Sequence, residues 1–132
     1  MKITQNTIDD ILNHAREGFP DEVCGLLAGS EGAVLRCFRI SNTDKSSVSY
    51  MMEPSEQFQA FKQMRKEGME LIAIYHSHPT STAYPSQTDV RLAYYQEAVY
   101  IIVSMQRAGA PEIRGFRIID GNISEVVLEV IP

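Results

Sequence analysis

His76 and His78 are the residues of this chain best suited to metal chemistry. They stand two positions apart after an apolar segment, and in extended backbone the side chains at i and i+2 point to the same face. Both imidazoles could therefore reach one ion, and imidazole nitrogen suits Zn²⁺. A catalytic zinc site uses three protein ligands and a water, and Asp89 is the nearest good candidate for the third ligand.

The tetrapeptide Ser86-Gln87-Thr88-Asp89 also has a purely structural interpretation. Ser-x-x-Asp before a helix is close to a capping box, with Ser86 as the N-cap and Asp89 as the third helical residue. The two interpretations are partly compatible, because a helix start fixes the direction in which Asp89 points. Two histidines at this spacing also occur on surfaces and in cores without any metal, so neither feature is decisive alone.

The elements that must position these residues begin with a helix over residues 7–17, with Thr7 as its N-cap. His14 falls on the polar side of this helix, and we expect it to be solvated. An apolar strand over 23–29 and a strand over 33–40 are joined by a hairpin turn at 30–32. A polar loop over 41–47 and a short extended piece over 48–52 lead to a second helix. Pro54 opens that helix, and Gly68 follows its end near residue 67.

The second half predicts a strand over 69–75, a loop over 76–85 and a helix over 87–95. A strand over 99–105 and a turn over 108–111 follow, and then a hairpin of 113–119 with 123–130 around Asp120-Gly121-Asn122. Strands interleaved with helices predict an α/β fold with a mixed sheet and helices packed on it. No repeat or linker divides the chain, so we expect one domain over 1–132.

Composition limits the classes of function. Apolar residues make up 44% of the 132 residues and charged residues 22%, which is ordinary for a soluble globular protein. The net charge of −5 and the lack of a Lys/Arg cluster disfavour a nucleic-acid partner. No apolar run approaches the ~18–20 residues of a membrane span, and the N-terminus lacks the apolar core of a signal peptide. We therefore expect a cytoplasmic protein without a membrane partner, in which Cys24 and Cys37 are buried thiols.

Taken together, the motifs resemble the JAMM (MPN-plus) metalloprotease family. Its signature is a distant Glu, then His-x-His-Pro, six residues, and Ser-x-x-Asp. This chain has Glu22, then His76-Ser77-His78-Pro79, residues 80–85, and Ser86-Gln87-Thr88-Asp89. The flanking pattern Pro-x-Glu-x-Cys-Gly-Leu-Leu also stands at 20–27. A four-part match at fixed spacing is far more specific than any one part.

The resemblance implies a cytidine-deaminase-like JAMM fold, a curved mixed β-sheet flanked by helices. It implies that His76, His78 and Asp89 bind one Zn²⁺, that Glu22 handles the proton of the attacking water, and that Ser86 donates to the oxyanion. Members cleave peptide or isopeptide bonds at the C-terminus of ubiquitin-like proteins. The short 80–85 loop is similar to the compact prokaryotic branch, whose partners are ubiquitin-like sulfur-carrier proteins ending in Gly-Gly, from which cysteine or a longer extension is released.

Several alternatives remain open at this level. Some relatives are non-catalytic binding scaffolds, and a zinc hydrolase of small peptides would use the same residues. Met51-Met52-Glu53 and the 41–50 loop are candidates for one wall of a groove for the carrier tail, or Met51 and Met52 are packing residues. Cys24 lies near Glu22 in sequence, and we expect a packing role for it. The oligomeric state, monomer or homodimer, is left undecided by the sequence.

Overall fold

The computed structural model describes residues 1–107 and 109–132, which form one eight-stranded mixed sheet and three helices. The predicted turn over 108–111 includes Ala108, which lies outside the described residues. The helices are α1 (Gln5–Gly18), α2 (Pro54–Lys66) and α3 (Gln87–Arg91). The strands are β1 (Lys2–Thr4), β2 (Cys24–Ser30), β3 (Ala33–Ile40), β4 (Glu70–His78), β5 (Val99–Ser104), β6 (Glu112–Ile119), β7 (Asn122–Val126) and β8 (Glu129–Ile131).

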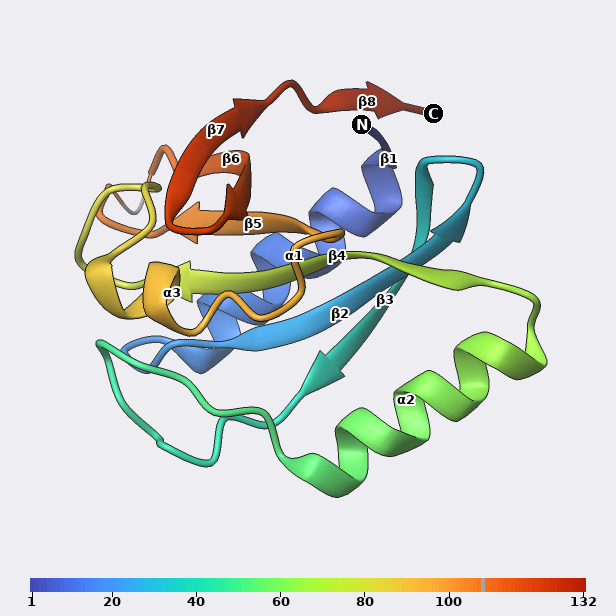
Figure 1. Cartoon of the computed structure of the whole chain (residues 1–132). Helices are drawn as coiled ribbons and strands as arrows, with labels where there is room; N and C mark the ends of the chain where they lie inside the picture. The colour runs from blue at the N-terminus through green and yellow to red at the C-terminus, as the bar shows by residue number, and fades with distance from the viewer. Residues whose placement is uncertain (108) are drawn as a thin grey trace.

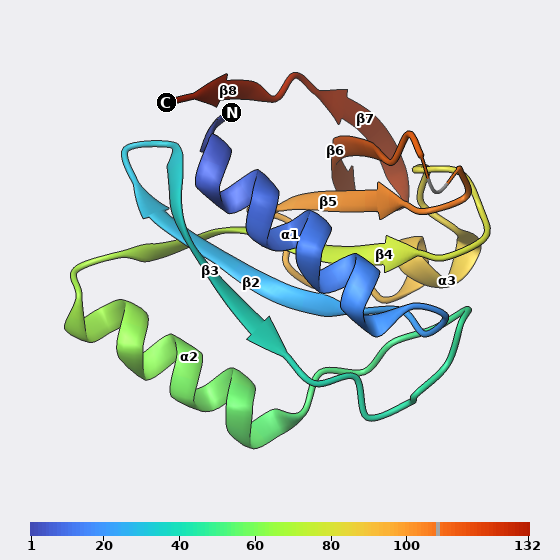
Figure 2. The ribbon, with the colours of Figure 1, turned by 180° about the vertical axis from the view of Figure 1, so that it is seen from behind.

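The sheet is curved and its strands run in the order β7-β6-β5-β4-β2-β3-β1-β8 (Figure 1). The β4–β5, β1–β3 and β1–β8 pairs are parallel, and the others are antiparallel. Helix α1 covers one face and α2 lies against the other (Figure 2). The predicted α/β class, with helices on a curved mixed sheet, is confirmed.

Each face of the sheet has its own hydrophobic core. On the α1 side, Ile8, Ile11 and Ala15 of the helix pack with buried residues of β2, β4 and β5. On the α2 side, Ala60 and Met64 pack with the opposite faces of the same central strands. Strand β2 is buried along all but its last residue, because a central strand covered on both faces must be apolar throughout.

The two hairpin turns agree with the sequence prediction. Strands β2 and β3 pair around Glu31 and Gly32, and β6 and β7 pair around Asp120 and Gly121. Both turns place two successive residues at positive φ, and Gly121 has a φ of 80°. This left-handed pair matches the right-handed twist of the flanking strands, as expected of Asp-Gly.

Several expected boundaries differ from those of the structure. Helix α1 begins at Gln5 with Thr4 as its N-cap, whose hydroxyl accepts from the buried Thr7 N–H at 3.2 Å. Helix α3 ends at Arg91 rather than 95, because the chain turns back so that the Tyr95 N–H can donate to the Tyr100 hydroxyl. The strand expected over 123–130 is two strands, since β7 pairs with β6 whereas β8 pairs with β1. The short extended piece expected over 48–52 ends at Met52, which forms an isolated bridge with Asn42.

Strand β4 extends further than expected and carries both histidines. It was expected to end at Tyr75, but it pairs with β5 as far as the His78–Ser104 register. The polar residue Ser77 fits in this buried strand because its side chain and its backbone N–H are both hydrogen-bonded. The Ser77 hydroxyl accepts from the Val23 N–H at 2.8 Å, and the Ser77 N–H donates to the Val23 carbonyl at 3.0 Å. His76 is therefore held by sheet pairing on both sides, with β2 and β5, and His78 by pairing with β5.

Candidate metal centre

His76, His78 and Asp89 direct three ligand atoms at one point. The two histidine Nε2 atoms are 3.1 Å apart, and they lie 3.1 Å and 3.0 Å from the Asp89 Oδ2. Among the described residues, this is the group of His, Cys, Asp and Glu side chains that could hold a metal ion. The structure thus brings together the three predicted ligands, from the end of β4 and the start of α3.

Helix α3 aims Asp89 through its capping box. The Ser86 hydroxyl accepts from the Asp89 N–H at 3.0 Å, and the Asp89 Oδ2 accepts from the Ser86 N–H at 2.9 Å. The predicted capping box is therefore confirmed. The same carboxylate oxygen faces both imidazoles, so the structural and the metal-binding interpretations describe one arrangement.

Hydrogen bonding prepares His78 to act as a ligand. Its Nδ1 donates to the Thr82 carbonyl at 2.8 Å, which leaves the lone pair of the neutral ring on Nε2, the atom that faces Asp89. His76 is held differently, since its ring is 1% exposed and stacks on Tyr50 with centroids 4.7 Å apart. Both rings are thus fixed by contacts outside the cluster.

The arrangement fits a tetrahedral zinc ion. Ligands bound at about 2.0–2.1 Å in that geometry lie about 3.3–3.4 Å from one another, close to the separations found here. Two imidazoles and a carboxylate are a donor set that zinc prefers. In the described residues, the buried side-chain N and O atoms without a partner are His76 Nδ1 and Glu22 Oε1, and both lie at this site. Such atoms are rare in proteins and point to a missing ligand or to function.

The ionisation of His76 and Asp89 favours metal binding, whereas that of His78 opposes it, because a bound proton competes with a cation for its nitrogen. Burial lowers the pKa of His76, which keeps its imidazole neutral. Burial opposes ionisation of Asp89, but hydrogen bonds from His76 and His78 outweigh it and hold the pKa of Asp89 well below its usual value. For His78, the bonds to Asp89 and Thr82 outweigh burial and raise the pKa. A cation supplies the positive charge that the carboxylate otherwise draws from the imidazoles.

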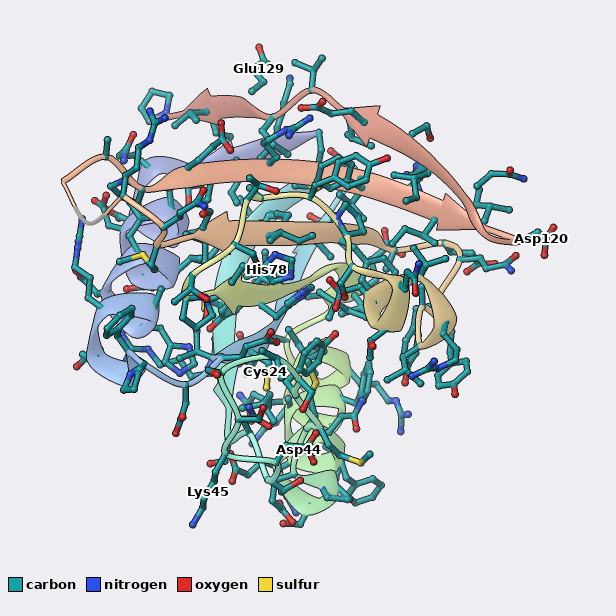
Figure 3. The ribbon with its side chains drawn as sticks, turned by 90° about the vertical axis from the view of Figure 1, so that its left-hand side faces the viewer. Cys24, Asp44, Lys45, His78, Asp120 and Glu129 are labelled. Atoms are coloured by element: carbon teal, nitrogen blue, oxygen red, sulfur yellow. The ribbon has the colours of Figure 1, made fainter. Side chains whose placement is uncertain are left out.

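Glu22 lies just before β2 and is 4% exposed. Burial raises the pKa of its carboxyl to about 7, and the nearby Asp89 and Asp44 add to the effect, against the attraction of His78. A carboxylate of that pKa can accept and release a proton at neutral pH. Its backbone is held by the loop after β3, because the Glu22 N–H donates to the Ser46 carbonyl at 2.8 Å. Figure 3 shows His78 at the end of β4, with Cys24 and this loop, which carries Asp44 and Lys45, below it.

Ser86 is exposed at the N-terminus of α3. Its oxygen accepts from Asp89 as the cap, and its own O–H remains available for donation. Cys24 has the packing role that we expected. It is buried, its thiol donates to the Ile40 carbonyl at 3.4 Å, and burial raises its pKa to about 12.

Tyr50 at the site was not expected from the sequence, and the environment of His14 differs from the one expected. Nothing in the sequence around Tyr50 signals that it stacks on a metal-ligand candidate. His14 is half-buried on the α1 side, and its Nδ1 hydrogen-bonds the Tyr75 hydroxyl at 2.7 Å. Burial, together with Arg39, lowers the pKa of His14 to about 4, so the expectation of a solvated histidine is wrong.

A cavity of about 240 Å³ adjoins the site. Tyr50 lines this cavity and stacks on His76. The other lining residues include Met51 and Met52, and Leu92, Tyr94 and Tyr95 from the segment after α3. Met51 and Tyr94 are exposed, at 55% and 76%. Met51 and Met52 thus line a cavity that Tyr50 joins to His76, and Met52 also packs against the core on the α2 side, as expected of a packing residue.

Comparison with known proteins identifies the family. Residues 4–119 match the family described as prokaryotic homologues of the JAB domain. The chain belongs to this family. It is 36% identical over 131 residues to the CysO-cysteine peptidase of Mycobacterium tuberculosis, a match that covers 98% of this chain and 90% of the relative. It is also 36% identical over 111 residues to the desampylase of Haloferax volcanii, covering 79% and 80%.

Solved structures of other proteins have the same fold. A protein of Desulfitobacterium hafniense superposes with a TM-score of 0.91 at 34% identity, covering 98% of this chain and 92% of that one. A JAB1/MPN domain protein of Archaeoglobus fulgidus superposes with a TM-score of 0.66 at 24% identity over the full length of both chains, which supports the fold alone. The JAB chain described here is thus a hydrolase with the JAMM fold, related to named peptidases. Within its described residues, no helix has the length and apolar character needed to cross a membrane.

Proposed function

We propose that this JAB protein is a zinc peptidase or isopeptidase that cleaves after the C-terminal Gly-Gly of a ubiquitin-like or sulfur-carrier protein. One observation supports it above the others. Three ligand atoms 3.0–3.1 Å apart lie beside a buried glutamate whose pKa is about 7. A scaffold has no use for a buried, unpartnered carboxylate next to a preformed ligand set.

His76, His78 and Asp89 would hold the ion. Zinc bound there would lower the pKa of a water to about 7 and polarise the scissile carbonyl. Glu22 would take the proton of the attacking water, because its carboxyl is buried near His78 and Asp89 and burial raises its pKa to about 7 in the metal-free protein. It then gives this proton to the nitrogen of the departing amine, so that the amine leaves in neutral form.

Ser86 acts on the carbonyl oxygen. Its O–H is not committed to the helix cap and can donate to the charge that develops on that oxygen during attack. Because the cap fixes Ser86 and Asp89 in one turn, the oxyanion donor and the third ligand keep a constant separation. Such fixed placement lets a donor stabilise the transition state without reorganising at the moment of reaction.

The substrate class follows from the named relatives and from the adjoining cavity. The relatives are named as a CysO-cysteine peptidase and a desampylase. In this chain, the cavity beside Tyr50 is mostly apolar and opens to the surface at Met51 and Tyr94. It would receive an apolar side chain of the carrier tail, while the small Gly-Gly residues pass over the ligand cluster. An extended tail of this kind commonly binds by strand-like pairing with side chains in pockets.

The test uses the zinc-loaded protein and a ubiquitin-like sulfur carrier from the same cell, extended beyond Gly-Gly by one cysteine or by a longer peptide. Intact mass follows the extension, with Glu22→Gln as the matched variant and zinc content measured for both. Loss of the extension with the wild type alone supports the proposal. If both proteins carry zinc and neither cleaves the carrier, the proposed substrate class is wrong. Equal cleavage by both would refute the role of Glu22.

A further inference from the structure

The loop between β3 and α2 is organised by one side chain, that of Asn42. Its Nδ2 donates to the Glu22 carbonyl at 3.0 Å and to the Ser49 carbonyl at 3.1 Å. Its Oδ1 accepts from the Asp44 N–H and from the Met51 N–H, both at 3.0 Å. All four hydrogen-bonding positions of the amide are therefore used, which is uncommon for a half-buried loop residue.

The four bonds also fix how the amide is oriented. A flipped amide would set its oxygen against the carbonyls of Glu22 and Ser49, and its nitrogen against two N–H groups. The side chain is thus locked in one position. On its donor side it holds the backbone of Glu22, and on its acceptor side it holds Met51, next to Tyr50 and the cavity.

Glu22 depends on this loop for its placement. It precedes the first residue of β2, so no strand pairing holds it directly. Its own backbone bonds are the N–H to the Ser46 carbonyl and the carbonyl to Asn42. By contrast, His76 and His78 are fixed by β4, and Asp89 is fixed by the cap of α3.

We infer that Asn42 is a positioning residue, which sets Glu22 and the cavity wall at Met51 in a fixed relation to the metal-ligand cluster. This inference rests on the proposed function. Displacement of a catalytic group by about 1 Å can cost on the order of 100-fold in rate. Loss of the bond to Glu22 should therefore lower turnover while the metal stays bound.

Asn42→Asp tests the donor side of the amide alone, because it removes the donors and keeps the acceptor. The carboxylate has the same shape and still accepts from Asp44 and Met51, but it cannot donate to Glu22 or Ser49. We expect kcat to fall roughly 10- to 100-fold, with KM and zinc content near those of the wild type. Asn42→Ala removes both sides, so it should also raise KM. Ser47→Asp is the matched control, because it adds the same charge to an exposed side chain of the same loop and keeps the Asn42 amide. It should stay within about 3-fold of the wild-type kcat.

The deciding measurement combines Asn42→Asp with Glu22→Gln. If Asn42 acts through Glu22, the double variant should have the residual rate of Glu22→Gln alone, because the group being positioned is already disabled. A further fall of similar size in the double variant would overturn the inference, as would an unchanged kcat in Asn42→Asp. Both results leave the proposed function intact, since that is judged by the wild type and Glu22→Gln. If Asn42→Asp fails to fold, Asn42→Ser removes the same donors without a charge and is judged by the same cycle.

Discussion

Substituting Glu22 by Gln should stabilise the metal-free protein at neutral pH. Burial raises the pKa of this carboxyl from 4.5 to about 7 in the folded state. Each unit of pKa shift corresponds to about 1.4 kcal/mol, so ionised Glu22 costs the folded protein up to about 3 kcal/mol. Gln has the same shape and carries no charge, so the variant should lack this cost.

The gain should depend on pH in a defined way. Below pH 4.5 the carboxyl is protonated in both folded and unfolded chains, so Glu and Gln should be nearly equivalent. Between pH 4.5 and 7 the unfolded chain releases the proton while the folded chain keeps it, so the free energy of unfolding of the wild type falls. Above pH 7 both states are ionised and the full difference between wild type and Glu22→Gln is present.

Urea unfolding followed by circular dichroism, in chelator at pH 4 to 8, measures this difference. The wild-type and variant curves share every other titration, including that of His14, which cancels in the subtraction. Glu97→Gln changes an exposed side chain and should give a flat, near-zero difference. If the Glu22→Gln gain is the same at pH 4 and pH 8, or absent at pH 8, Glu22 is not held as a buried base.

Three further outcomes follow from the site and its surroundings. Asp89→Ala should lose zinc and turnover together, because two imidazoles alone are too few ligands, and metal analysis after dialysis would contradict this if one zinc per chain remained. Ser86→Ala should lower kcat by roughly 10²–10³-fold and remove the helix cap, with zinc retained. Ser86→Asp should restore the cap, measured by thermal unfolding, but not kcat. Relative to His14→Gln, the wild type should lose stability as pH falls from 6.5 to 4, because the unfolded chain takes up a proton that buried His14 refuses. Urea titrations of the two proteins measure this difference, in which the opposite contribution of Glu22 cancels, and a difference that does not change with pH would exclude His14 as its source.

The sequence predicted the ligand set because its signals are local. His76 and His78 share a face through the period of a strand, and Ser86 and Asp89 are one turn of a helix start. The apolar run of β2 and the Asp-Gly turn before β7 are equally local patterns. In each case the residues that determine the conformation lie within a few positions of one another.

The features that were missed or misplaced, such as β1, the end of α3 and the burial of His14, depend on partners distant in sequence. Strand β1 has three residues and exists because β3 and β8 pair with it from positions 33 and 129 onward. The length of α3 is set by Tyr100, which accepts from Tyr95. His14 is half-buried because Tyr75 reaches it from β4, across 61 residues of sequence. Helical periodicity alone cannot reveal such contacts.

The ligand candidates and Glu22 are held by different parts of the fold, so substitutions in the two parts should have different effects. The three ligand candidates belong to the end of β4 and the cap of α3, which are held by sheet pairing and by a capping box. Glu22 lies instead between α1 and β2, and the cavity wall at Met51 lies in the loop between β3 and α2; the four bonds of Asn42 organise that loop and join it to Glu22. Changes in the loop should therefore lower turnover without emptying the metal site, whereas changes at the ligands should remove both. In the proposed mechanism a proton is transferred at the junction of the two parts, which would explain why a buried carboxylate that costs stability is retained there.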